Sequence, residues 1–126
     1  MREIKFRGKR KDTFEWIIGY YGHKDLSEEH FIIVPTFDPQ GSTRLQYFTD
    51  HLVDPNTVGQ YTGLVDQNNV EICEGDILQH KKHGKKIVEF INGKYVCESL
   101  DLSEINEWAE IIGNIHDNTE LFTELT

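Results

Sequence analysis

The chain has 126 residues, of which 37% are hydrophobic and 11% aromatic, and its formal net charge is -9 at pH 7. This length suits one ordinary domain with its own core, and the aromatic content argues against a disordered chain. The excess of acidic residues disfavours broad, non-specific attraction to nucleic acid or to an anionic membrane.

The N-terminal part of the chain carries three strand signals. Charged and apolar residues alternate over residues 3–7, which predicts a half-buried strand, and the polar residues 8–13 predict a loop. The β-branched and aromatic stretch at 16–21 predicts a second strand, antiparallel to the first. A third strand is expected over residues 30–34, where Pro35 ends it.

Turn formers and short strands alternate in the centre of the chain. We expect a turn at 36–43, a short strand at 45–48, and strands at 61–64 and 70–73 joined by a turn at 66–69. Asp54 and Pro55 have the pattern of an N-cap followed by the first residue of a helix, which predicts a helical turn.

The sharpest local signal is Asn92-Gly93, because both residues tolerate the positive φ that a two-residue type I′ hairpin requires. The turn predicts the register, which pairs Ile91 with Lys94, Phe90 with Tyr95, Glu89 with Val96 and Val88 with Cys97. Alternation then predicts one apolar face, directed to the core, made of Val88, Phe90, Tyr95 and Cys97. The intervening residues are expected to form a mixed outer face.

Three more elements are expected near the C-terminus, namely a helix at 102–108, a strand at 110–116 interrupted at Gly113, and one helical turn at 119–122. Asp101 and Glu104 have the spacing of a capping box for the first helix. Asn118 has the position of an N-cap for the last turn.

Positive charge is concentrated in two short stretches. Six of the 13 cationic residues fall within the first 11 positions, and four more form a second cluster at 81–86. From Glu98 to Thr126 there are eight acidic residues and no Lys or Arg. The sequence therefore predicts two basic spots and one acidic C-terminal region.

No membrane segment or secretion signal is indicated. The chain has no apolar run long enough for a transmembrane helix, and residues 1–5 lack the apolar stretch of a signal peptide. Cys73 and Cys97 belong to no CxxC pattern, so we expect two reduced structural thiols and no zinc or redox motif. We therefore expect a cytoplasmic protein without a membrane partner.

The familiar catalytic patterns are missing from the sequence. There is no G-x-S-x-G elbow, no phosphate-binding glycine loop and no H-E-x-x-H zinc motif. Glu3-Ile4-Lys5 has the acidic-x-lysine tripeptide of some nucleases, but no aspartate precedes it. We therefore assign no catalytic, metal or cofactor-binding residue and expect no cofactor.

Two short motifs have a structural and a chemical interpretation. His80 and His83 could bind a metal, but neighbouring lysines oppose a cation and no cysteine or carboxylate completes the ligand set. A solvated hairpin loop is the favoured interpretation. Glu74 and Asp76 could present paired carboxylates, but a tight turn at Gly75 with Asp76 as a hydrogen-bond acceptor is favoured.

The basic clusters are candidate contacts for the phosphates of nucleic acid. The residues concerned are Lys81, Lys82, Lys85 and Lys86 with Lys9, Arg10 and Lys11. Tyr20, Tyr21 and Tyr47 are candidate stacking partners for bases. A solvated charged loop is the alternative, and exposure of Phe31, Ile33 or Trp108 would instead indicate a protein interface.

Three separated blocks resemble the YopX family of phage and prophage proteins and occur in the family's order. They are REIKFRG at 2–8, VDPNTVGQYTGLVD at 53–66 continuing as EICEGDI at 71–77, and EIIGNIHDN at 110–118. The resemblance implies a predominantly β protein of a phage or prophage, acting in the bacterial cytoplasm. It implies no established activity and supplies no catalytic residues.

The expected fold is mainly β, with a small, strongly bent sheet or SH3-like barrel in the C-terminal half. The N-terminal half is expected to be an antiparallel β segment, and one or two short helices complete the fold. We expect a single YopX-like domain over 1–126, with sub-lobes 1–52 and 53–126 as the alternative.

The favoured function is a non-enzymatic accessory binding module, because the sequence has no catalytic motif, the architecture is β and charge is unevenly distributed along the chain. Its partner would be a protein or another copy of itself, and the basic N-terminus and acidic C-terminal region complement each other for head-to-tail self-association. Nucleic-acid binding through the basic clusters is the alternative. An enzyme, which would require distant carboxylates and histidines to converge in a pocket, is the third hypothesis.

Overall fold

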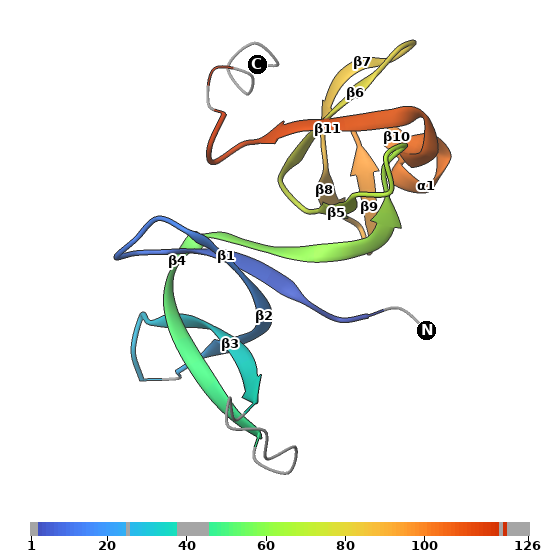
Figure 1. Cartoon of the computed structure of the whole chain (residues 1–126). Helices are drawn as coiled ribbons and strands as arrows, with labels where there is room; N and C mark the ends of the chain where they lie inside the picture. The colour runs from blue at the N-terminus through green and yellow to red at the C-terminus, as the bar shows by residue number, and fades with distance from the viewer. Residues whose placement is uncertain (1–2, 25, 38–45, 119, 121–126) are drawn as a thin grey trace. The chain divides into compact units, whose positions relative to one another are not determined.

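Antiparallel strands make up most of this computed structural model, which describes residues 3–24, 26–37, 46–118 and 120 (Figure 1). The expected mainly β fold is confirmed. The chain divides into two units, an N-terminal unit of residues 4–60 and a C-terminal unit of residues 61–126 with 1–3. The division lies between Gln60 and Tyr61, after the 52/53 boundary considered from the sequence.

The described part of the N-terminal unit consists of four strands, namely β1 (Phe6–Arg10), β2 (Trp16–His23), β3 (His30–Phe37) and the first part of β4 (Gln46–Val65). Each strand pairs antiparallel with the next, and β4 also pairs with β1. The hydrogen-bonded ladder of these strands therefore closes on itself, as the strands of a barrel do. The antiparallel pairing of the first two strands, expected from sequence, is confirmed.

Ile32 and Val53 form the buried centre of the N-terminal unit. Gly8 lies against both, since a Cβ added there would come within 3.0 Å of their side chains. Gly19 lies against the backbone of β3, where an added Cβ would be 2.4 Å from the carbonyl oxygen of Ile33. Glycine at these two positions allows the strands to approach closely.

The first and third strands differ from the sequence expectation. β1 extends to Arg10 through residues expected to form a loop, and the turn follows at 11–13. β3 continues through Pro35, although Pro35 was expected to end it. Beyond Ile33 the register of β3 is with β4 alone, and a proline is tolerated where a strand is paired on one side only. The expected strand at 45–48 corresponds to the start of β4. Of the turn expected at 36–43, residues 36–37 instead belong to β3, and residues 38–43 lie outside the described residues.

The helical turn predicted at Asp54 and Pro55 is wrong, because both residues lie in β4 where its register with β1 shifts. The Asp54 carboxylate accepts a hydrogen bond from the backbone N–H of Asn56 at 3.0 Å. The Thr57 hydroxyl donates to the Asp54 carbonyl at 2.6 Å and accepts from the N–H of Lys9 at 2.9 Å. The capping chemistry seen in the sequence therefore stabilises a bulge in a strand.

The C-terminal unit contains the end of β4 and the remaining elements. These are β5 (Glu71–Cys73), β6 (Asp76–His80), β7 (Gly84–Ile87), β8 (Glu89–Ile91), β9 (Lys94–Cys97), β10 (Leu100–Asp101), α1 (Leu102–Ile105), a 3-10 turn (Asn106–Trp108) and β11 (Ala109–Asn114). Two three-stranded sheets, β11-β6-β7 and β10-β9-β8, accompany the β4–β5 pair. The expected turn at 66–69 joins β4 to β5 and is confirmed.

One hydrophobic core holds the C-terminal unit together. Its buried members come from β5, β6, β9, β11, α1 and the residue before β8, and they are Ile72, Leu78, Val88, Cys97, Leu102, Ile105 and Ala109. Leu64, Tyr95, Leu100 and Ile111 are partly buried and pack against it. Both sheets and the short helix thus share one apolar interior.

The hairpin at Asn92-Gly93 is confirmed, with φ of 53° and 82° at the two residues. Three of the expected pairs form, namely Glu89 with Val96, Phe90 with Tyr95 and Ile91 with Lys94. The local turn chemistry therefore sets the register of β8 and β9.

The expected division of this hairpin into a core face and an outer face is only partly correct. Val88 and Cys97 are buried as expected, but Phe90 is 52% exposed and Val96 is buried. Val88 lies outside the ladder, because its backbone exchanges two hydrogen bonds with the turn at 75–76. β9 lies between β8 and β10, whereas β8 is the outer strand and its side chains have fewer neighbours. Period-2 alternation along the sequence does not contain this difference between the two strands.

The predicted helix at 102–108 is present as α1 followed by the 3-10 turn. Asp101 occupies the N-cap position, but its side chain makes no capping hydrogen bond, so the predicted capping box does not form. The Asp101 carboxylate instead forms an ion pair with Lys94 at 2.8 Å.

The last strand, β11, shifts register between Ile111 and Gly113, as the interruption predicted at Gly113 requires. It ends at Asn114, two residues earlier than expected. Asn118 Oδ1 accepts a hydrogen bond from the N–H of Asn114 at 3.1 Å and closes the turn that follows. The helical turn expected at 119–122 lies outside the described residues.

Candidate functional site

The basic hairpin between β6 and β7 presents two exposed lysines, Lys81 and Lys82, at its turn. His80 Nδ1 accepts the backbone N–H groups of Lys82 at 3.0 Å and His83 at 3.1 Å. The ring centres of His80 and His83 are 4.7 Å apart. Nδ1 of His80 therefore holds the turn.

The electrostatic surroundings of this hairpin are positive. Burial, and then the charges of His80, Lys82 and Lys86, lower the pKa of His83 below its usual value. Lys86 forms an ion pair with Glu98 at 2.9 Å, so part of the charge is compensated. Across the described residues, no three His, Cys, Asp or Glu side chains gather closely enough to hold a metal ion.

The N-terminal basic cluster does not present its cations together. Arg10 forms a bidentate pair with Asp12, with Nε to Oδ1 at 2.9 Å and Nη2 to Oδ2 at 2.6 Å. This pair raises the pKa of Arg10 and lowers that of Asp12. Lys9 instead places its Nζ 5.8 Å from the centre of the Trp16 ring. The three predicted contacts Lys9, Arg10 and Lys11 are thus in different surroundings.

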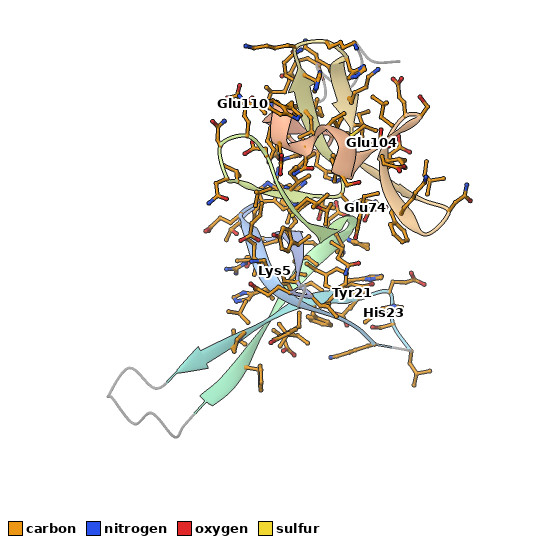
Figure 2. The ribbon with its side chains drawn as sticks, turned by 90° about the vertical axis from the view of Figure 1, so that its right-hand side faces the viewer. Lys5, Tyr21, His23, Glu74, Glu104 and Glu110 are labelled. Atoms are coloured by element: carbon orange, nitrogen blue, oxygen red, sulfur yellow. The ribbon has the colours of Figure 1, made fainter. Side chains whose placement is uncertain are left out.

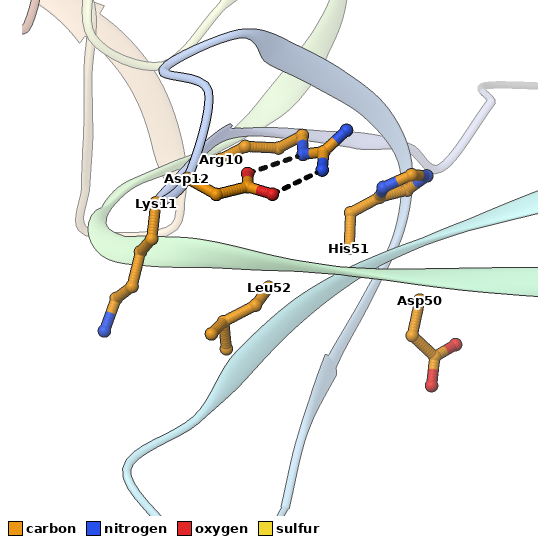
Figure 3. Close-up of a pocket in the computed structure, with 6 residues that line it drawn as sticks. All are labelled: Arg10, Lys11, Asp12, Asp50, His51 and Leu52. Carbon is orange, nitrogen blue, oxygen red and sulfur yellow. Dashed lines mark hydrogen bonds and ion pairs between the residues drawn. The ribbon is translucent and has the colours of Figure 1, made fainter.

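A hollow of about 240 Å³ lies beside this cluster and is lined by Arg10, Lys11, Asp12, Asp50, His51 and Leu52 (Figure 3). His51 points to the side of β4 where the Arg10–Asp12 pair lies, whereas Asp50 and Leu52 point to the opposite side (Figure 3). Because Arg10 is neutralised by Asp12, the hollow offers a mixed surface and no concentrated positive charge.

The three tyrosines expected to stack on bases have different positions. Tyr20 is 55% exposed on β2. The ring centre of Tyr21 lies 5.5 Å from that of Phe6, its hydroxyl bonds to His30 Nδ1, and the His30 ring stacks on His23 at 4.1 Å. Tyr21 and His23, both on β2, are labelled in Figure 2. The side chain of Tyr47 lies outside the described residues. Tyr20 is therefore the more exposed of the two candidate tyrosines whose side chains are described, since Tyr21 is 38% exposed and bonded to His30.

The turn at Glu74-Gly75-Asp76 is structural, as predicted. Gly75 has a φ of 93° and Asp76 is buried. The Asp76 carboxylate accepts the backbone N–H of Cys73 at 2.8 Å. Both cysteines are free, also as predicted. Burial raises the pKa of the Cys97 thiol to about 11, which keeps it protonated and unreactive near neutral pH.

The outer strand β8 exposes apolar side chains that sequence reasoning assigned elsewhere. Phe90 is 52% and Ile91 45% exposed, and the Phe90 ring lies 4.9 Å from that of Tyr95. A hollow of about 250 Å³ adjoins these rings, and its lining includes Leu64 and Leu102 with the Lys94–Asp101 ion pair. No signal in the sequence reveals this surface, because the edge position of β8 depends on the order of strands in the sheet.

Backbone geometry makes β8 an open edge, since it pairs with β9 alone among the described strands. In an antiparallel hairpin the residues next to a two-residue turn exchange hydrogen bonds, and the following pair does not. Ile91 therefore bonds to Lys94, and the N–H and C=O of Phe90 point away from β9. The N–H and C=O of Val88 point the same way as those of Phe90, and they bond to the C=O of Asp76 and the N–H of Gly75. The edge of β8 is therefore covered at Val88 and open at Phe90.

Two further surface observations bear on partners. The sequence predicted that exposure of Phe31, Ile33 or Trp108 would indicate a protein interface. Trp108 is 68% exposed, whereas Phe31 and Ile33 are half-buried. Within the described part of the chain, no helix has the length and apolar character needed to cross a membrane.

Comparison with known proteins identifies a family and a solved structure that are similar to this chain. The family model described as YopX protein matches residues 5–123. The crystal structure of protein EF1440 from Enterococcus faecalis is similar, with a TM-score of 0.63 and 28% identity over 96% of this chain and 99% of that chain. No curated protein matches the chain.

Proposed function

The chain belongs to the YopX family, and we propose that it is a non-enzymatic accessory binding module of a phage or prophage, acting in the bacterial cytoplasm. The observation that carries the proposal is the open edge of β8, where exposed Phe90 and Ile91 adjoin a hollow in the C-terminal unit. Exposed apolar edge strands are templates for pairing with another chain, and proteins without such a partner usually cover them.

The partner recognises β8 by adding a strand to it. The outward N–H and C=O of Phe90 supply the main-chain hydrogen bonds, and the hollow beside Tyr95 and Leu64 takes an apolar side chain. In this mode of recognition the backbone provides affinity and the pockets for side chains provide specificity.

The partner strand that we assign is the β8 of a second copy. Two antiparallel β8 strands centred on Phe90 are related by a two-fold axis, so each satisfies the other with the same surface. Such pairing continues the Tyr95–Phe90 row into an aromatic row across both copies. It also places Glu89 of one copy opposite Ile91 of the other.

Sedimentation equilibrium over a range of concentrations, at low and high salt, tests this assignment. We expect reversible dimers that persist at high salt, because apolar and main-chain contacts are little screened. Head-to-tail association between the basic N-terminus and the acidic C-terminal region would instead be lost at high salt. A monomer at every concentration and salt would contradict self-association through β8.

Paired substitutions make the test specific to β8. Phe90→Lys sets like charges opposite each other at the two-fold axis and is expected to abolish the dimer. Ile91→Lys places its charge opposite the partner's Glu89 and is expected to retain or strengthen it. Val70→Lys alters another exposed aliphatic residue of the same unit and serves as the control. Equal effects of Phe90→Lys and Val70→Lys would show that the edge is not the interface.

A second candidate function, nucleic-acid binding, is favoured by the exposed lysines of the basic hairpin. Lys81 and Lys82 lie at its turn, and Lys85 and Lys86 follow in β7. Titration of labelled single- and double-stranded DNA at low ionic strength tests this role, with Lys81→Gln/Lys82→Gln as the variant. Binding that is absent, or that does not depend on salt, would rule it out.

A further inference from the structure

One face of the N-terminal unit gathers cationic and aromatic side chains. The β1–β2 register sets Lys9 opposite Trp16 and Arg7 opposite Ile18, and side chains directly opposite one another share a face. The guanidinium carbon of Arg7 lies 4.9 Å, and Nζ of Lys9 5.8 Å, from the centre of the Trp16 ring. The indole is therefore flanked by two positive charges.

The same face continues along β2 onto β3. Tyr20 follows Ile18 by two positions, so its exposed side chain points the same way as that of Ile18. Phe31 shares this face through its pairing with Gly22, and Nζ of Lys24 lies 5.1 Å from the centre of its ring. We call Arg7, Lys9, Trp16, Tyr20, Lys24 and Phe31 the cationic–aromatic face.

Two acidic side chains of β4 lie at the border of this face. Asp50 lies opposite Ile33, and Asp54 lies opposite Lys9. Both carboxylates belong to β4, and the Asp54 carboxylate already accepts the N–H of Asn56. Arg7 and Lys9 belong to β1 and Lys24 follows β2, whereas both carboxylates belong to β4.

We propose that the cationic–aromatic face binds single-stranded nucleic acid. Phosphates are held by Arg7, Lys9 and Lys24, and a base stacks on Tyr20. A cationic surface that tracks the backbone, combined with exposed rings, is how proteins hold single strands without reading sequence. Bases in a duplex already stack on each other and cannot cover a protein ring, so the proposal is specific to single strands.

This inference does not depend on the strand-pairing function. The residues involved lie in the N-terminal unit, whereas β8 lies in the C-terminal unit. It also differs from nucleic-acid binding by the basic hairpin, which lies in the C-terminal unit as well. Variants of each surface therefore distinguish strand pairing through β8, nucleic-acid binding by the basic hairpin and single-strand binding by the cationic–aromatic face.

The first experiment measures fluorescence anisotropy of a labelled oligothymidine of about 12 nucleotides, a length within the range of known single-strand sites. Three phosphate contacts predict that the logarithm of the affinity falls with the logarithm of the salt concentration with a slope of about -2. We expect the matching duplex to bind more weakly. No binding at low salt, or equal binding of the duplex, would overturn the proposal.

The second experiment compares variants of the protein. Tyr20→Ala is expected to weaken binding roughly 5- to 100-fold, the loss of one stacked base. Arg7→Gln is expected to weaken binding and to make the salt slope less steep by about 0.7. Lys81→Gln/Lys82→Gln should bind as the unchanged protein does. If only this hairpin variant loses binding, the cationic–aromatic face is not the site.

A third measurement requires no change to the face itself. With Trp108 replaced by Phe, the remaining indole signal comes from Trp16, and bound oligonucleotide is expected to quench it. An unchanged Trp16 signal during binding would contradict contact at this face. Salt-sensitive self-association without oligonucleotide binding would assign the face to an acidic protein segment and would also overturn the proposal.

Discussion

The carboxylate of Asp66 accepts a hydrogen bond from the backbone N–H of Ile111 at 3.0 Å, although the two residues are 45 positions apart. Its other oxygen accepts the N–H groups of Asn68 at 2.9 Å and Val70 at 3.0 Å. Asp66 is buried, so this one side chain ties the β4–β5 turn to β11. It is a structural carboxylate of the C-terminal unit.

Asp66→Ala is expected to lower the free energy of unfolding by about 1–3 kcal/mol, because it removes an acceptor from three backbone donors at once. Asp66→Asn keeps one acceptor oxygen and should cost less. Chemical denaturation measures both, with Asp12→Ala as the control, since the ion pair of that exposed carboxylate is screened by solvent and is expected to contribute little. Equal stabilities of Asp66→Ala and Asp12→Ala would refute the structural role.

Gly19 and Gly22 of β2 form a matched pair for a test of strand packing. A Cβ at Gly19 would lie 2.4 Å from the carbonyl oxygen of Ile33, so Gly19→Ala must separate two strands and is expected to cost about 2–4 kcal/mol. A Cβ at Gly22 would meet only the flexible end of the Ile33 side chain at 3.0 Å. Thermal melts should therefore show a much smaller loss for Gly22→Ala, and the reverse order would be inconsistent with this register.

Gly93 tests the hairpin that sets the β8–β9 register. Its φ is 82°, and no atom lies within 4 Å of an added Cβ, so Gly93→Ala is opposed by backbone strain alone. We expect a loss of about 1–2 kcal/mol. Gly93→Asn should be nearly neutral, because asparagine tolerates this conformation. If denaturant titrations gave Gly93→Asn a cost as large as that of Gly93→Ala, the result would argue against a type I′ turn.

Cys97 predicts a specific dependence of stability on pH. Burial raises the pKa of its thiol from an ordinary 9.0 to about 11, so the folded state keeps a proton that the unfolded state loses. This contribution is complete below about pH 9 and is lost as the pH rises toward about 11. The difference in stability between the unchanged protein and Cys97→Ala should therefore narrow over that range, and a constant difference would speak against a protonated, buried thiol.

Local chemistry explains which elements were predictable. Asn92 and Gly93 fix their turn through φ alone, and Gly75 with Asp76 makes a turn from adjacent residues. Such features need no knowledge of distant strands. Gly113 likewise marked the irregularity in β11 correctly.

The features that failed depend on contacts between distant residues. Asp54 had the sequence signal of an N-cap, but the bond from Lys9 to Thr57 across 48 positions draws the segment into a bulge. Phe90 was expected to be buried and is exposed, whereas Val96 was expected on the outer face and is buried. Phe90 lies on the outer strand β8 and Val96 on the central strand β9, and this order of strands cannot be read from alternation. These facts arise only when the strands are paired.

The candidate surfaces show the same limit. Lys81 and Lys82 were correctly placed in a hairpin loop, and their charge was visible in the sequence. The pairing of Arg10 with Asp12 was not anticipated, although the two residues are close in the chain. The cationic–aromatic face required the β1–β2 register, which brings Arg7 beside Trp16.

The most direct test of the account is amide hydrogen exchange at Phe90 and Ile91, measured in dilute and concentrated protein. The Ile91 N–H bonds to β9 and should be protected under both conditions, which makes it the internal control. The Phe90 N–H points outward and should exchange rapidly in dilute protein and become protected as copies pair. Rapid exchange of Phe90 at every concentration would contradict β8 as the docking edge.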